Sequence, residues 1–566
     1  MEANGKKMSN INFIISKSDV CLSVILACLF SASPYYIRTG SCPLNLEFYI
    51  TVFFLLLAFL LLNIGTRAIF FGYFLVVDEK KKKIFQRSED FFNSKLAVYK
   101  ITCIILLCWL PVLIALYPGT FINDTWGQLQ QYIRWIEATG NTKGILFDQH
   151  PVFDTLFMGS LIVPIEKLTG NWHVAIFTYV ILQACLTSLS FSYSVLYLRK
   201  NLGLDEFCSF SLLLLYCVLP LYAASVQTVS KDALFSWIYV LFFVHFIEIV
   251  RTNGVILQDR SFLYKIILAS IFCVLTKKVG MYVMIFSFIA LLFAKLDNKR
   301  NIKIIIITMV VFAVGIMPLF RHMLGARPGG IQEMFSLPFQ QTARYVKYHP
   351  KDVFPSEKVV LSKVLPYNTL AKRYNPTNAD SIREYRPQAR AIDYIRYLKV
   401  WAAQLLRHPY TYVEAFQASS SGWFSFYEYD PLMNMNWHNQ LNKKIIPGWV
   451  PMRYGFSKKT ADAMQNAYHN IYRIPIWGCA LSYGLYAALL PAFALATALR
   501  NWNNKNTKYY LVLVPELLSI VLGCWLASVS SHFEGRRFLY PLTYTAPLLL
   551  GWCMYIYQNE VAKIKK

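Results

Sequence analysis

A series of apolar runs, each about as long as a bilayer is thick, constrains this sequence more than any other feature. A helix that crosses the hydrocarbon core needs roughly 20 mostly apolar residues. Hydrophobic residues make up 56% of the 566 residues and charged residues only 15%. Twelve candidate spans lie at about 19–37, 47–66, 96–116, 173–198, 206–228, 232–250, 261–276, 279–295, 302–320, 474–499, 508–529 and 537–557. The sequence therefore predicts an all-α polytopic membrane protein.

The formal net charge of +25 does not indicate nucleic acid as a partner, because the Lys and Arg residues gather in short clusters at the ends of apolar runs. Such clusters are typical of cytoplasmic loops and orient a membrane protein. If the short run 152–165 lies at the membrane interface without crossing, the clusters at 80–83, 199–200, 295–303 and 500–508 all lie inside. We therefore predict twelve spans with both termini in the cytoplasm.

The predicted spans divide the chain into four parts. The N-terminal helices and a cytoplasmic loop occupy 1–95, a core module 96–320, an outer loop domain 321–473 and the C-terminal helices 474–566. The outer loop domain mixes charged and aromatic residues with Pro, Gly and Asn turns, which is typical of a folded domain of short helices rather than of a linker. The first apolar run also resembles a signal peptide, but we favour a retained span.

Polar residues interrupt the apolar pattern most densely at 117–154, which the predicted topology places outside. The apolar residues from Trp126 to Ile136 recur every three or four positions, which predicts a short amphipathic helix that lies on the outer leaflet and ends by Gly140. Asp124 precedes this helix and is a good N-cap. In a membrane-proximal cleft the same carboxylate could accept a proton from a hydroxyl or bind a divalent cation such as Mg²⁺ or Mn²⁺.

The second half of this segment carries Asp148 and His150, with Pro151 well placed to begin the next helix. Two interpretations stay open for this pair. The side chains either cap a helix at the interface, or line the same cleft as Asp124 and orient a sugar or an acceptor.

Basic residues also occur at the predicted outer ends of apolar helices, against the positive-inside preference. These residues are Lys231, Lys277, Lys278, Arg536 and Arg537. Cations at headgroup level could hold a lipid-linked phosphate, Arg through its bidentate fork and Lys as a point charge. Alternatively, each could reach to the headgroups singly, and Lys231 with Asp232 could form a self-contained ion pair.

Together these features resemble the GT-C superfamily of membrane glycosyltransferases, over about residues 96–300 and again near 530–541. The likeness rests on Asp124 in the first outer loop, on the pair His150-Pro151 at the head of the next helix, and on the basic motifs VSKDALF, LTKKVGMY and EGRRFLYP. The sequence departs from many relatives in two places. Thr125 stands where they have a second acidic residue, and Val152 replaces the second proline of His-Pro-Pro.

The resemblance implies transfer of a sugar from a polyprenyl-phosphate donor to a hydroxyl of a cell-envelope glycan, lipid or protein. This would occur on the outer face of a bacterial cytoplasmic membrane, with inversion at the anomeric carbon. Asp124 would act as general base or metal ligand, with Asp148 and His150 beside it. The outer Lys and Arg residues would hold the donor phosphate, with Asp232 and Trp126 in support. No cofactor is implied beyond a divalent ion at Asp124.

Two other functional classes stay open at this stage. One is a transporter or flippase for a lipid-linked glycan, whose path the outer charges would line. The other is a polymerase or ligase that uses an oligosaccharide on a polyprenyl-pyrophosphate carrier.

Overall fold

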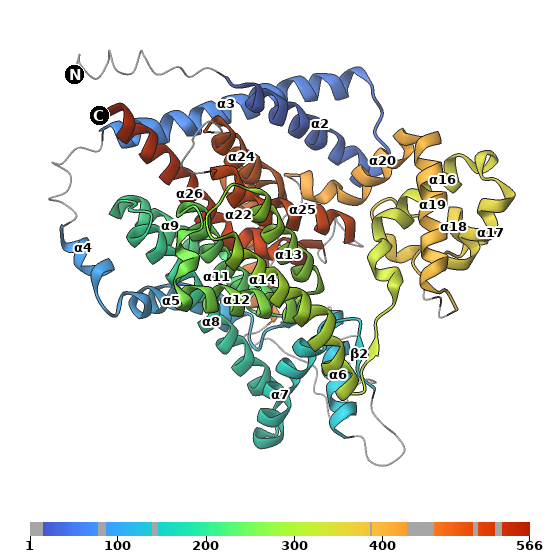
Figure 1. The fold of residues 1–566 in the computed structure, drawn as a ribbon, viewed down its shortest axis with the longest axis horizontal. Coiled ribbons are helices and arrows are strands. Elements are labelled where there is room, and N and C mark those ends of the chain that lie inside the picture. The colour runs from blue at the N-terminus through green and yellow to red at the C-terminus, as the bar shows by residue number, and fades with distance from the viewer. Residues whose placement is uncertain are drawn as a thin grey trace.

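The structure, a computed structural model, describes residues 15–76, 86–137, 145–384, 386, 388–426, 458–501, 508–526 and 535–565. It is a bundle of helices with a smaller helical domain at one end (Figure 1). The first part of the chain forms α2 (Lys17–Thr39), α3 (Leu46–Val76), α4 (Gln86–Asn93), α5 (Ala97–Ala115), α6 (Asn123–Ile136), α7 (Val152–Thr169) and α8 (Trp172–Lys200). The middle of the bundle continues with α9 (Glu206–Val218), α10 (Pro220–Val226), α11 (Lys231–Arg251), η2 (Val255–Gln258), α12 (Arg260–Thr276), α13 (Lys278–Phe293), α14 (Lys299–Val311), η3 (Phe312–Ile316) and α15 (Met317–Met323).

The smaller domain, which we call the outer domain, stands apart on the right of Figure 1. It contains η4 (Ile331–Phe335), α16 (Ser336–Tyr348), η5 (Pro350–Asp352), α17 (Pro355–Val364), α18 (Tyr367–Arg373), η6 (Ala379–Ser381), α19 (Ala391–Arg407), α20 (Pro409–Ser420) and η7 (Ser421–Phe424). Its short helices enclose their own apolar core, which includes Phe339, Leu361 and Tyr397. A folded helical domain therefore follows α15. Residues 427–457, with Trp437 and Trp449, lie outside the described part of the chain.

The C-terminal part of the chain packs back into the bundle. It forms α22 (Lys458–Tyr472), α23 (Pro475–Leu481), η8 (Leu485–Leu489), α24 (Leu490–Arg500), η9 (Tyr509–Leu513), α25 (Val514–Leu526), η10 (Gly535–Leu539) and α26 (Tyr540–Lys565). The end of α26 lies toward the same side of the bundle as α4, opposite the outer domain (Figure 1).

Seven helical segments in the described residues are long and apolar enough to cross a membrane. They are α2, α3, α5, α8, α11, the run Lys299–Met323 and the run Tyr509–Leu526. Helices α9 and α10 meet at a bend of 54° and would together add an eighth span. The chain is thus an all-α polytopic integral membrane protein. Helices also occupy the remaining predicted ranges, and the total of twelve crossings stays a prediction.

Helix α11 lies at the centre of the bundle. In the most apolar stretch of α11, 89% of the residues are buried inside the protein. In the corresponding stretch of α3 only 11% are buried, so most of the surface of α3 is available to lipid. Phe242 and Phe246 of α11 pack edge-on against Phe288 of α13. Burial of aromatic side chains on all faces holds α11 in one position. Its first turn is consequently a rigid base for polar residues.

The structure corrects two details predicted for α6. Asp124 is not the N-cap but lies inside the first turn, because the helix begins at Asn123 after Ile122. The apolar face does not lie on lipid either: Trp126 is 4% exposed and Leu129 is fully buried in the protein core, while Ile136 at the far end is 37% exposed. Helix α7 packs against this face. The predicted stop at Gly140 falls outside the described residues.

Candidate functional site

Two short strand pairings place the polar segments of the core module side by side. Strand β1 (Thr120–Phe121) pairs in parallel with β3 (Thr228–Val229), so the first turns of α6 and α11 are neighbours. Strand β2 (Phe147–Asp148) pairs in parallel with β4 (Arg327–Pro328), just after α15. An otherwise helical chain thereby brings four connecting segments to one end of α11.

Local hydrogen bonds hold the two first turns in register. The Ser230 hydroxyl caps α11 by accepting a hydrogen bond from the backbone N–H of Ala233 at 3.2 Å. Thr125 donates its hydroxyl to the carbonyl of Val229 at 2.5 Å. Such bonds fix the start of a helix. The first turn of α11, which carries Lys231, is therefore held beside α6.

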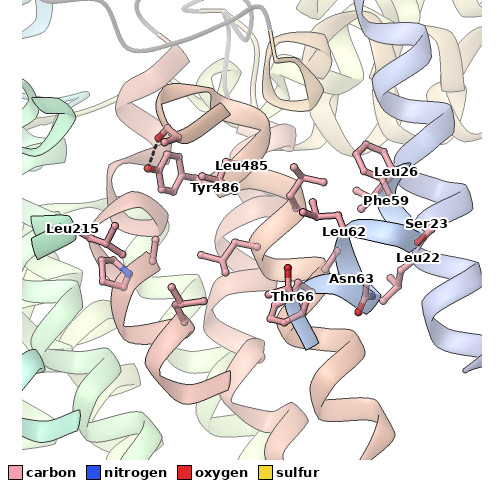
Figure 2. A pocket seen from close by; sticks show the side chains of 18 of the residues that line it. Leu22, Ser23, Leu26, Phe59, Leu62, Asn63, Thr66, Leu215, Leu485 and Tyr486 are labelled. Atoms are coloured by element: carbon pink, nitrogen blue, oxygen red, sulfur yellow. Dashed lines mark hydrogen bonds between the residues drawn. The ribbon is translucent and has the colours of Figure 1, made fainter. Parts of the chain in front are cut away.

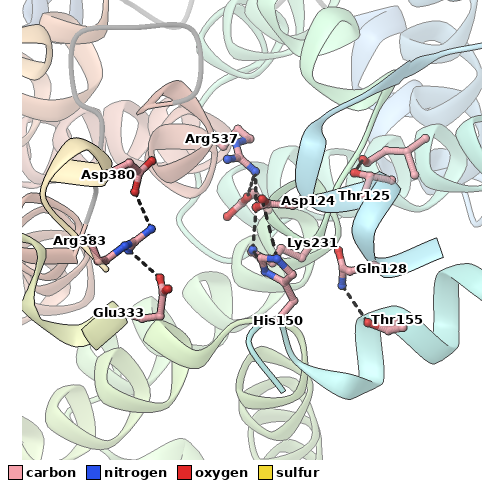
Figure 3. A network of polar contacts seen from close by, with 12 residues as sticks. Asp124, Thr125, Gln128, His150, Thr155, Lys231, Glu333, Asp380, Arg383 and Arg537 are labelled. Carbon is pink, nitrogen blue, oxygen red and sulfur yellow. Dashed lines mark hydrogen bonds and ion pairs between the residues drawn. The ribbon is translucent and has the colours of Figure 1, made fainter. Parts of the chain in front are cut away.

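Asp124 is the centre of the resulting cluster (Figure 3). Its Oδ2 lies 3.1 Å from Nζ of Lys231 and 2.9 Å from Nη1 of Arg537. His150 Nε2 is 3.8 Å from Oδ1 of Asp124, and His150 Nδ1 is 2.5 Å from Nζ of Lys231. The Asp124 side chain is 28% exposed, so a ligand can reach it. The structure thus joins four of the predicted site residues, which lie far apart in the sequence.

A second, buried layer of charge lies behind this cluster. Asp232 Oδ1 is 2.8 Å from Nζ of Lys277, and its Oδ2 is 3.7 Å from Nη1 of Arg537. The side chains of Asp232 and Lys277 are only 2% and 7% exposed. Lys231 and Asp232 therefore do not form the self-contained pair considered from the sequence. Each turns to a partner on another element, and Arg537 connects the two layers.

Asp148 belongs to a separate ion-pair group. It lies 2.7 Å from Nη1 of Arg321 and 3.4 Å from Nζ of Lys278, and Lys278 also donates to the Asp148 backbone carbonyl. The structure therefore separates Asp148 from His150: only His150 contacts Asp124. The side chain of Arg536 lies outside the described part of the structure, and Trp126 is buried in the core.

The charges around Asp124 determine which groups carry a proton. Burial alone would raise the pKa of Asp124, but the charges of Lys231 and Arg537 hold it well below its usual range. Burial and the nearby Lys231 lower the pKa of His150 to about 3. At neutral pH the carboxylate is therefore ionised and the imidazole neutral. Both can accept hydrogen bonds, and His150 does not serve as a proton donor.

Sequence reasoning missed two charged residues near the cluster. Arg321, at the end of α15, is a basic residue at a predicted outer helix end, which is the criterion that selected Lys278. Asp154 lies in α7 and is 3% exposed, and neither of its carboxylate oxygens has a hydrogen-bond partner in the described residues. Burial raises the pKa of Asp154 well above its usual range. A carboxylate inside the apolar run 152–165 was the available signal, because such groups are costly there.

The outer domain borders this region through η4. Glu333 of η4 pairs with Arg383 at 2.6 Å, and Arg383 also contacts Asp380 at 2.5 Å (Figure 3). Burial raises the pKa of Glu333, whose carboxyl also senses the charges of Lys231 and Asp124. Polar groups from the outer domain thus lie within electrostatic range of the cluster.

The donor set at Asp124 does not fit a divalent cation. Lys231 and Arg537 already place positive charge within 3.1 Å of the same carboxylate oxygen. In the described residues the side chains around Asp124 offer one carboxylate and one imidazole, and the two cations already occupy the carboxylate oxygen Oδ2. The cations that surround Asp124 therefore replace a metal ion in the local charge balance.

Two apolar cavities open in the bundle. One, of about 390 Å³, is lined by Phe153 of α7, by Leu234, Trp237 and Leu241 along one face of α11, and by Phe272 of α12. The other, of about 340 Å³, lies between α2, α3 and the C-terminal helices (Figure 2). Only the first reaches the head of α11, because Leu234 follows Lys231 by one helical turn.

Comparison with known proteins identifies the family of the chain and no function. Residues 76–565 match the family DUF6020, which is described as a family of unknown function. The match covers most of the chain, which therefore belongs to this family. No curated protein and no solved structure matches it.

Proposed function

We propose that this member of the DUF6020 family is a GT-C-type membrane glycosyltransferase. It would transfer a sugar from a polyprenyl-phosphate donor to a hydroxyl of a cell-envelope glycan, lipid or protein. One observation carries the proposal: a cluster of cations lies at the head of α11, and an apolar cavity along the same helix begins at Leu234, one turn beyond Lys231. A lipid-linked phosphate needs this pairing of charge and hydrocarbon.

The apolar cavity suits the tail of such a donor. Leu234, Trp237 and Leu241 recur at three and four residues, so they form one stripe on α11. The stripe begins one turn below Lys231 and extends for about 10 Å at 1.5 Å per residue. An isoprenoid chain that lies on this stripe has its phosphate at the level of the cluster.

The charge balance suits the phosphate. In the described residues the two ion-pair groups contain five cations and three carboxylates, with Asp154 kept neutral by its burial. The cations are Lys231, Lys277, Lys278, Arg321 and Arg537, and the carboxylates are Asp124, Asp148 and Asp232. The surplus positive charge would be compensated by a bound phosphate. Charge-assisted bonds from Lys and Arg strengthen as a phosphodiester becomes a departing phosphomonoester, which favours the transition state.

Asp124 would receive the acceptor. Its exposed carboxylate accepts a hydrogen bond from the acceptor hydroxyl, whose oxygen attacks the anomeric carbon opposite the phosphate. The bond between the anomeric carbon and the phosphate oxygen breaks, its electron pair stays on that oxygen, and the hydroxyl proton passes to Asp124. Because the pKa of Asp124 is low, the proton moves late in the step. As the carboxylate loses its charge, Lys231 and Arg537 become free to hold the leaving phosphate. One displacement inverts the anomeric centre.

Purified protein in detergent tests the proposal. The probes are polyprenyl-phosphate mannose, glucose and arabinose with a bacterial envelope extract as acceptor, and the readout is free polyprenyl phosphate. Wild type should release it and Asp124→Asn should not. The matched control is Asp90→Asn, an exposed carboxylate on α4 at the other side of the bundle.

Binding of polyprenyl phosphate provides a second measurement that needs no acceptor. The lipid should raise the melting temperature of wild type. Lys231→Gln should need about tenfold more lipid for the same rise, as expected for a lost charge-assisted contact. A lipid-linked glycan that crosses vesicles with no bond cleaved would instead establish a flippase. Release of polyprenyl pyrophosphate would indicate a polymerase or ligase. Either result rejects the proposal.

A further inference from the structure

We infer that the outer domain contains a transition-metal site formed by His349, Asp352 and His408. The inference is independent of the proposed function, because these residues belong to a different part of the molecule from Asp124. In the described residues they are the one group of at least three His, Cys, Asp or Glu side chains whose ligand atoms lie close enough together for an ion.

The three ligands come from separate helix ends. His349 follows α16, Asp352 ends η5, and His408 lies between α19 and α20. Their ligand atoms all lie within 4.8 Å of one another. His408 Nε2 is 2.9 Å from Oδ2 of Asp352, and His349 Nδ1 is 4.0 Å from the same oxygen. Side-chain rotations that tilt the two rings toward each other would place the three ligands about 2 Å from one ion.

The backbone gives the two histidines matching positions. Each directly precedes a proline, and their backbone angles are similar, with φ −126° and ψ 52° at His349 and φ −135° and ψ 68° at His408. A residue before proline is restricted from helical geometry, so both helices end at these residues. The two imidazole rings stack with centroids 3.8 Å apart and planes at 16°. The ligand geometry is thus set by helix ends rather than by flexible loops.

The second nitrogen of His349 is also engaged. His349 Nε2 lies 2.9 Å from the hydroxyl of Thr411, which leaves Nδ1 turned toward Asp352. Histidines that bind metals usually hold their other ring nitrogen in such a hydrogen bond, which selects the tautomer and the ring orientation. Thr411 would therefore be a positioning residue of this site.

The donor types of this cluster suit a transition-metal ion. The neighbouring Arg407 does not compete for the site, because it donates to the Asp352 backbone carbonyl at 2.7 Å and pairs with Glu357. Two neutral imidazoles and one carboxylate make a donor set suited to Zn²⁺ and related ions, with a further position open to water. The ligand side chains are 27% to 50% exposed, so an ion can enter from solution.

Zinc binding by the full-length protein tests the inference. Chelator-treated protein is titrated with Zn²⁺ against a chromophoric chelator, and Co²⁺ is added separately to record its visible absorption. We expect one tight Zn²⁺ per chain, and affinity at least about tenfold lower in His349→Ala and in His408→Ala. The matched control is His322→Ala, an exposed histidine on α15 outside the cluster, which should bind as wild type does.

A stability readout separates metal binding from a structural role of the histidine pair. Zn²⁺ should raise the melting temperature of wild type and of His322→Ala, because a ligand that binds the folded state stabilises it. Asp352→Asn preserves the side-chain shape and the hydrogen-bond acceptor, and should melt like wild type without metal yet gain little from Zn²⁺. Failure of wild type to bind Zn²⁺, or equal binding by the His349 and His408 variants, would overturn the inference.

Discussion

Two carboxylates in this protein each lie between two cations but differ in their exposure to solvent. Asp124 lies between Lys231 and Arg537, and Asp19 lies between Arg67, at 3.9 Å, and Arg500. The Asp124 side chain is 28% exposed and that of Asp19 is 3% exposed. Asp19 also accepts a hydrogen bond from Asn63, a residue that lines the cavity of Figure 2. A carboxylate between two cations is thus by itself no sign of function.

The difference lies in access and in additional polar groups. Around Asp124 there is an accessible face and a neutral histidine, which a substrate could use, and a second, buried layer of charge lies behind them. Around Asp19 the charges are sealed between α2, α3 and α24, where they can only join helices. Access to solvent therefore separates a candidate reaction site from a structural ion pair, and four measurements test this comparison.

The largest expected effect is on activity at the exposed carboxylate. Asp124→Asn should lower polyprenyl phosphate release by at least about 10²-fold, the usual contribution of a positioned proton acceptor. Its melting temperature should change less than that of Asp19→Asn, because Asp124 is 28% exposed and Asp232 remains within 3.7 Å of Arg537. A variant that melts far below wild type would instead make Asp124 a structural residue like Asp19.

The buried carboxylate should show the opposite pattern. Asp19→Asn leaves two arginines without their charge partner in a sealed site, which typically costs about 3–5 kcal/mol. We expect a large fall in melting temperature in detergent and unchanged activity per folded molecule. Stability equal to wild type would show that burial does not distinguish the two clusters.

The stability of the protein should fall in acid because His150 is neutral in the folded state. The folded pKa of His150 is about 3 and the unfolded value is about 6.5, so the unfolded chain takes up a proton between these values. Stability should therefore fall as pH decreases below about 6.5, with a contribution of about 2 kcal/mol by pH 5. His150→Gln, which cannot be protonated, should lack this contribution. Melting temperatures at pH 7.5 and pH 5 of both proteins measure it, and equal acid sensitivity would contradict the assignment.

The smallest effect concerns Asp154, a carboxylate that has neither access nor a hydrogen-bond partner in the described residues. Its folded pKa is raised, so the unfolded chain loses its proton first and ionisation opposes folding above the unfolded pKa. Asp154→Asn should raise stability at pH 7.5 by about 1 kcal/mol, roughly the energy of one pKa unit, because the amide takes up no proton on folding. The gain should shrink toward pH 4. A loss of stability at pH 7.5 would show that the charged form has a partner.

Much of the site could be found from the sequence, because charges at the ends of apolar runs are visible as local exceptions. Asp124, His150, Lys231 and Arg537 were selected in this way, and they meet in the structure. Asp148 and His150, which the sequence grouped together, have different partners in the structure: Asp148 contacts Arg321 and Lys278, whereas His150 contacts Asp124. Arg321 was missed although it satisfied the same criterion.

The sequence by itself determined the membrane class, the helix positions and the set of charged residues available for chemistry, because run length and composition are properties of neighbouring residues. Only the tertiary structure decided which carboxylate meets which cation and which stays open to solvent. Lys231 and Arg537 lie 107 and 413 residues from Asp124 in the chain, and their meeting depends on strand pairing and on the packing around α11. Exposure likewise follows from how whole helices pack, which no local pattern contains.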